Sequence, residues 1–156
     1  MGEPLTEGTP GLGTAARMRI LVYCGVWIVL LNLVTPSSGF HVVPLSFVLK
    51  NKLHLSAHEL AAFSAWAGIP AYFAFAFGVV RDYWSPLRLG DRGYFILFGA
   101  LSAAVFAIYA FVPVSLAMML AASIVGTICF LFLWGGWNGL GSVIGQRYAM
   151  SGQISA

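Results

Sequence analysis

Charged side chains that could carry specific chemistry are concentrated in one short segment between two apolar stretches. Its candidate residues are two carboxylates, two arginines and the glycines at its ends: Gly78, Asp82, Arg88, Asp91, Arg92 and Gly93. Asp82 follows an apolar stretch and could accept hydrogen bonds from a helix N-terminus, where negative charge is favoured. Arg88, Asp91 and Arg92 could form ion pairs that act as a latch between helices that rearrange. The alternative is an ordinary loop in which the carboxylates only balance the arginines, since exposed ion pairs contribute little stability.

Three polar residues, Asn32, His41 and Asn138, lie inside otherwise apolar stretches. Polar groups are costly within a membrane, so they tend to face the interior of a helix bundle or a cavity. For the two asparagines, hydrogen bonding between helices is an equally good explanation, worth about 0.6 kcal/mol per bond. His41 lies near the end of its stretch, where a solvated imidazole is an alternative to a proton-coupling one.

The sequence contains no arrangement of residues that is typical of an enzyme or of a metal site. His54 and His58 are four residues apart, but two ligands do not complete a zinc site. Cys24 and Cys129 both fall within apolar runs and form no disulfide or metal-binding pattern. We therefore expect a protein without enzymatic activity, cofactor or bound metal.

The elements that carry these residues are long apolar runs. Of the 156 residues, 60% are hydrophobic and 8% are charged, against about 25% charged in soluble domains. The eight basic residues are scattered and do not form a surface for nucleic acid. Because a helix crosses the hydrocarbon core with about 20 apolar residues, the sequence predicts an all-α, polytopic bundle in the lipid bilayer. The transmembrane region covers residues 17–156, with spans predicted at 19–48, 57–80, 93–111 and 115–144.

The first predicted span is too long for one straight crossing. As a continuous helix it would reach about 45 Å, whereas the hydrocarbon core is about 30 Å thick. Helix-breaking residues interrupt it at Thr35-Pro36-Ser37-Ser38-Gly39. We favour a tilted helix kinked at Pro36 over a re-entrant hairpin, because each half alone is short for a span and irregular backbone is not tolerated against lipid.

The basic residues predict the orientation of the chain. If four spans alternate in direction, six arginines share one side of the membrane: Arg17, Arg19, Arg81, Arg88, Arg92 and Arg147. Only Lys50 and Lys52 lie on the other side. The positive-inside rule therefore predicts a multi-pass protein of the cell membrane with its N-terminus in the cytoplasm. Residues 1–16 are polar, and we expect them to form a disordered cytoplasmic segment.

Three features of the sequence together match the pattern of one family of membrane proteins. Gly78-x-x-x-Asp82 closes the second predicted span, and Asp91-Arg92-Gly93 leads into the third. The long first span is followed by the outer loop Leu49-Lys50-Asn51-Lys52-Leu53-His54-Leu55-Ser56. With these features, residues 17–156 resemble the major facilitator superfamily of secondary transporters. Tyr83 stands where the family motif usually has a basic residue, which leaves open whether Asp82 or Asp91 has the latch role.

The resemblance implies a fold of two six-helix bundles with a substrate site between them. The chain would then be an N-terminal fragment with the first four helices and the start of the fifth, and the missing C-terminal helices of the same protein would be its partner. Helices one and four of the first bundle line the pathway in that family, so Asn32, His41 and Asn138 become candidate substrate-pathway residues. The segment from Gly78 to Gly93 would be the conformational latch.

The function expected from this resemblance is transport of a small solute by alternating access, with a proton or another ion as a candidate coupling partner. The alternative is a complete, small four-helix membrane protein that acts as an assembly factor or as a subunit of a complex.

Overall fold

The computed structural model describes residues 13–36, 39–111 and 113–148, which form helices joined by short connections. In chain order the elements are α1 (Thr14–Leu33), α2 (Val42–Asn51), α3 (Ala57–Tyr72), α4 (Ala74–Tyr83), the short 3-10 helix η1 (Pro86–Arg88), α5 (Asp91–Phe111) and α6 (Leu116–Arg147). Four segments are long and apolar enough to cross a membrane, namely α1, α3 together with α4, α5, and α6. The all-α prediction is confirmed, and the four long helices are consistent with a polytopic membrane protein.

The second, third and fourth predicted spans correspond to helices whose ends are shifted. The span predicted at 57–80 continues to Tyr83 and is divided at Phe73 into α3 and α4. The division follows Pro70, which lacks the N–H that a helix interior requires. The backbone tightens there, with the Phe73 amide donating to the Pro70 carbonyl at 3.1 Å. The remaining two predicted spans match α5 and α6.

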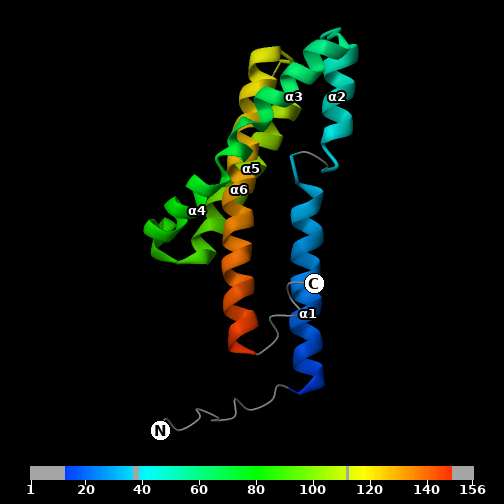
Figure 1. Ribbon diagram of the computed structural model, residues 1–156. Coiled ribbons are helices and arrows are strands. Elements are labelled where there is room, and N and C mark those ends of the chain that lie inside the picture. Colours follow the sequence, from blue (N-terminus) through cyan, green and yellow to red (C-terminus); the bar gives the residue numbers. More distant parts are fainter. Residues whose placement is uncertain (1–12, 37–38, 112, 149–156) are drawn as a thin grey trace.

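The first predicted span is not one kinked helix, so that expectation was wrong. α1 ends at Leu33 and α2 begins only at Val42. Pro36 accounts for the stop, because proline cannot donate a hydrogen bond and disfavours helical geometry in the residue before it. Figure 1 shows that α2 continues in the general direction of α1, which excludes the re-entrant hairpin.

Three expectations concern residues that the structure does not describe, and one of them, the start of a fifth helix, falls on residues 149–156. Ser37 and Ser38, in the middle of the helix-breaking cluster, lie outside the described residues. So do residues 1–12 of the segment that we expected to be disordered. The described part of the chain begins at Gly13, and α1 starts immediately after it.

α6 is the central helix of the bundle, since it contacts α1, α3, α4 and α5. Figure 1 shows α3 and α5 along one half of α6 and α1 beside the other half. Its contact with α5 contains the stacked rings of Phe98 and Phe132, whose centroids are 4.3 Å apart. Cys24 and Cys129 are buried in the same cluster. A second cluster takes one buried residue each from α2, α3 and α6: Leu49, Phe63 and Met119.

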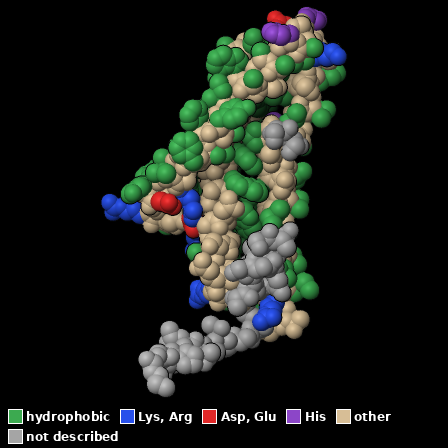
Figure 2. All heavy atoms as spheres, viewed as in Figure 1, with side chains coloured by type: hydrophobic (Ala, Val, Ile, Leu, Met, Phe, Trp, Pro, Cys, Tyr) green, Lys and Arg blue, Asp and Glu red, His purple; other side chains and the backbone are tan. Residues whose placement is uncertain are grey.

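Large apolar side chains also cover the outside of the bundle. Val43, Phe75 and Phe111 are among those exposed, and Figure 2 shows hydrophobic side chains spread along its outer surface. Soluble proteins rarely expose contiguous apolar patches of more than a few hundred Å². A lipid bilayer solvates such a surface, so the exposed faces support the same multi-pass membrane assignment as the lengths of the helices.

Candidate functional site

A cavity of about 460 Å³ lies between α2, α3, α5 and α6. Val34, Thr35 and Pro36, from the break between α1 and α2, form part of its wall. Most of the lining is apolar, and it includes four aromatic rings that come from α3, α5 and α6: Phe63, Phe106, Tyr109 and Phe130. The volume falls within the range of small-molecule sites, about 300–1,000 Å³.

His41 immediately precedes α2 and lines this cavity. Its imidazole ring meets the Phe106 ring edge to face, with centroids 5.5 Å apart, and the Phe40 ring at 6.2 Å. The Nδ1 atom is buried and has no hydrogen-bond partner among the described residues. A buried polar atom without a partner costs about 1–3 kcal/mol, so the imidazole retains hydrogen-bonding capacity that the described protein does not use.

Several hydroxyl groups on the cavity wall, in contrast, are paired within the protein. The hydroxyls of Tyr109 on α5 and Ser123 on α6 are 2.7 Å apart. The Thr127 hydroxyl lies 3.1 Å from the Ala67 carbonyl oxygen on α3 and 2.9 Å from that of Ser123. These bonds connect α6 to both α5 and α3, so they hold the walls of the cavity together.

The two asparagines predicted for the substrate pathway do not line the cavity. Asn32 is exposed, and its Nδ2 donates to the Ile28 carbonyl of the same helix at 2.9 Å. Asn138 is exposed on α6. Of the three predicted pathway residues, the structure brings only His41 to the cavity wall.

A salt bridge joins the end of α4 to the start of α5. Arg81 Nη2 lies 2.8 Å from Asp91 Oδ1, and Arg81 Nε lies 3.3 Å from the same oxygen. The two side chains are 25% and 28% exposed, so the pair is partly shielded from solvent. Charge-assisted hydrogen bonds are roughly twice as strong as neutral ones, which allows this pair to tie the two helices together.

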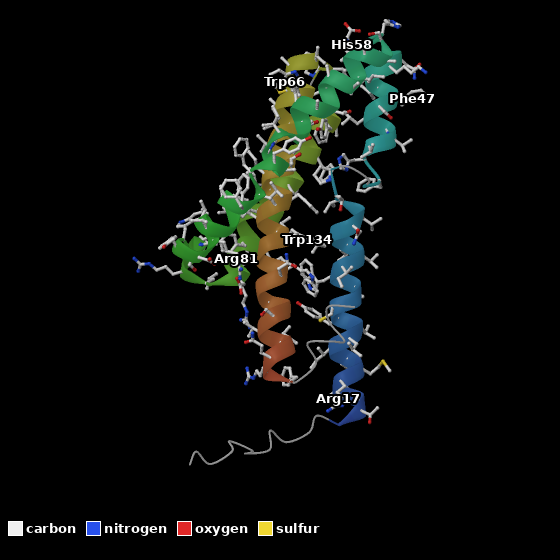
Figure 3. All side chains as sticks on the ribbon, viewed as in Figure 1. Arg17, Phe47, His58, Trp66, Arg81 and Trp134 are labelled. Carbon is white, nitrogen blue, oxygen red and sulfur yellow. The ribbon has the colours of Figure 1, made fainter. Side chains whose placement is uncertain are left out.

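Arg81 also lies against two glycines of α6. A Cβ atom built at Gly135 would be 3.6 Å from Arg81 Cδ, and one at Gly139 would overlap the guanidinium group. Figure 3 shows Arg81 at the end of α4, beside α6. The missing side chains at these two positions make room for the arginine. Gly78, which was predicted as part of the latch, is exposed, and nothing lies within 4 Å of a Cβ built there.

The structure shows a different ion pair from those predicted among the loop residues. Asp82, Arg88 and Arg92 are exposed, and within the described ranges none of them takes part in a salt bridge. Asp91 pairs with Arg81, a residue that the sequence analysis did not include in the latch. A signal was available, because Arg81 lies within an apolar helix and an ionisable group at such a position needs a partner.

Buried contacts hold the turn between α4 and α5 in an unfavourable backbone conformation. Leu87 has a φ of 56°, in the left-handed region that non-glycine residues rarely adopt. Tyr94 is buried, and its hydroxyl donates to the Trp84 carbonyl. Gly93 is also buried, and a Cβ there would overlap the Pro86 carbonyl. Such strain persists only where the surroundings over-determine it, and it is frequent in segments that switch.

Comparison with protein-family models, with curated proteins and with solved structures found no match for this chain. The cavity, the broken first span and the salt-bridged turn are the structural features that bear on function, together with the motif residues of the sequence.

Proposed function

We propose that this chain forms the N-terminal part of a secondary transporter, which moves a small solute across the membrane by alternating access. The observation that carries the proposal is the cavity beside the break in the first span, with His41 on its wall. In secondary transporters, substrate sites are typically formed by discontinuous helices near the middle of the membrane.

The position of the helix break supports this function. Backbone outside a helix is tolerated at membrane depth only where it is buried in protein or lines a cavity. Val34, Thr35 and Pro36 satisfy this condition, because they line the cavity. A broken span that only connected two helices would have no need of such a space.

The salt bridge between Arg81 and Asp91 supplies the second part of the proposal. Alternating access requires contacts that hold one end of the bundle closed and that break when it opens. A partly exposed ion pair at a strained turn is suited to this role, since its loss costs less than the loss of a packed core. The second six-helix bundle implied by the family resemblance would face this one across the pathway.

Labelling of cysteines with a membrane-impermeant methanethiosulfonate reagent tests the proposal in the natural protein. Ser64→Cys places a thiol on the cavity wall, and Ala65→Cys, which does not line the cavity, is the matched control. We expect Ser64→Cys to react with reagent supplied from the side of the α4–α5 turn. Asp91→Asn should raise this rate several-fold, because it breaks the salt bridge, and should leave Ala65→Cys unchanged.

The proposal is contradicted if Ser64→Cys is unreactive from both sides, or if Asp91→Asn does not alter its rate. An assembly factor or structural subunit, the alternative function, has no need of a cavity whose access changes. The same measurement therefore separates the two functions.

A further inference from the structure

We infer that the cavity binds a neutral aromatic molecule that carries a hydroxyl group, with the imidazole of His41 as its hydrogen-bonding partner. The identity of this occupant as the transported solute rests on the function proposed above. The binding of this occupant does not depend on that function, because it is inferred from the lining of the cavity alone.

The lining excludes charged solutes. None of the described residues on the cavity wall is Asp, Glu, Lys or Arg. An ion transferred into such a space would lose its hydration without gaining a counter-charge, which is strongly unfavourable. The occupant that this wall accepts is therefore neutral.

The shape and chemistry of the wall favour an aromatic occupant. Phe63 comes from α3, Phe106 and Tyr109 come from α5, and Phe130 comes from α6, so rings approach the cavity from three helices. Aromatic rings pack on one another in offset or edge-to-face arrangements that add about 0.5–1.5 kcal/mol beyond the burial of area. The edge-to-face contact of His41 with Phe106 shows that this wall already accommodates such packing.

The hydrogen bonds of the polar groups on the wall indicate which functional group the occupant carries. Of the seven hydroxyls on the wall, the one of Ser102 lies beside Cys129. The other six have partner atoms within the protein: those of Thr35, Ser46, Ser64, Tyr109, Ser123 and Thr127. Among the described residues, neither nitrogen of the His41 imidazole takes part in a hydrogen bond; Nδ1 is enclosed, whereas Nε2 is not and is the nitrogen that an occupant can reach. A neutral imidazole offers one donor and one acceptor nitrogen. A hydroxyl group can donate a hydrogen bond to an unprotonated ring nitrogen or accept one from a protonated ring nitrogen. It can therefore pair with the imidazole in either tautomer.

Binding of 2-naphthol to the protein in phosphatidylcholine nanodiscs tests this inference, with empty nanodiscs to correct for partition into lipid. The comparison ligand is 2-methylnaphthalene, in which a methyl group replaces the hydroxyl. We expect wild-type protein to bind 2-naphthol about fivefold more tightly, the effect of one ordinary hydrogen bond. His41→Phe should abolish this preference, and His41→Gln, which retains hydrogen-bonding groups, should restore part of it.

A cavity-filling variant tests whether the ligand lies where we infer. Gly68 lines the cavity, and nothing lies within 4 Å of a Cβ built there, so Gly68→Leu should place its side chain in the cavity and block binding. Gly99 has the same free space around it but does not line the cavity, so Gly99→Leu is the matched control and should bind normally. The anion 2-naphthoate should not bind to any of these proteins.

Equal affinity of wild type and His41→Phe for 2-naphthol would overturn the inference, as would saturable binding of 2-naphthoate or unchanged binding by Gly68→Leu. The failures of the two proposals are distinguishable. If binding depends on His41 but Asp91→Asn does not change the labelling of Ser64→Cys, the binding site is supported and the transport function is contradicted. If the labelling changes but binding does not depend on His41, the transport function is supported and this class of ligand is contradicted.

Discussion

Arg81 makes two contacts that respond differently to substitution. Its guanidinium pairs with Asp91, and its side chain lies against Gly135 and Gly139 of α6. The first contact depends on charge, whereas the second depends on the absence of side chains. A single arginine thereby links the ends of α4 and α5 to the central helix.

We predict that Gly139→Leu displaces the guanidinium of Arg81. The overlap with a side chain at this position should lower the free energy of unfolding by about 1–3 kcal/mol. Unfolding in mixed detergent micelles measures the loss. Gly78→Leu is the control, because nothing lies within 4 Å of a Cβ at Gly78, and its effect should stay within about 0.5 kcal/mol.

The combination of Gly139→Leu with Asp91→Asn makes the prediction more specific. Both substitutions disturb the same contact, so their effects on unfolding should sum to more than the effect of the double variant. Strict additivity would show that the glycine and the salt bridge act independently.

Individual helices differ in how their ends are stabilised. α1 ends before a proline-containing break, where the Thr35 hydroxyl donates to the Leu31 carbonyl at 3.0 Å, whereas α3 begins with a reciprocal pair of hydrogen bonds. The Ser56 hydroxyl accepts from the Glu59 amide at 3.3 Å, and the Ser56 amide donates to Glu59 Oε2 at 2.8 Å. The start of α3 is therefore fixed by a pair of local hydrogen bonds that a single substitution can remove.

We predict that Ser56→Ala destabilises the start of α3. Loss of an N-cap serine costs about 1 kcal/mol, and hydrogen exchange of the first-turn amides of α3 should rise accordingly. Ser46→Ala serves as the control, because the Ser46 hydroxyl donates only to the Val43 carbonyl of its own helix. Protection that falls equally in both variants would contradict the capping role.

The whole molecule is arranged with its arginine-bearing segments away from the α2–α3 turn. Figure 3 places Arg17 and His58 at opposite ends of the bundle, with Arg81 between them and on the side of α4. The chain therefore supplies positions at which its orientation in the membrane can be measured, and the positive-inside rule makes a definite prediction for them.

We predict that His58→Cys reacts with an impermeant maleimide applied to intact cells. Tyr83→Cys should react only after the membrane is permeabilised. The native cysteines are 3% and 0% exposed, so they contribute little background. Labelling of both positions from the same side would contradict an alternating arrangement of four spans, and exchanged sides would contradict the predicted orientation.

The sequence alone was sufficient to predict that this chain contains four helices long and apolar enough to span a membrane. Length and apolar character decide whether a segment can replace water by lipid, and both are properties of consecutive residues. Three of the long helical segments therefore lie close to the predicted spans, and Pro36 and Gly39 indicated an interruption of the first one. A proline is compatible with either a kink or a complete stop, and only the structure shows that α1 ends at Leu33 and that α2 begins at Val42.

Only the tertiary structure decided which polar side chains come together. Asn32, His41 and Asn138 look equivalent as polar residues in apolar runs, yet only His41 lines the cavity, since helix rotation sets the direction of each side chain. Asp91 pairs with Arg81, ten residues earlier, because the strained turn at Leu87 reverses the chain and brings the ends of α4 and α5 together. Contacts of this kind depend on how the helices are placed relative to one another, and the composition of each helix does not determine that placement.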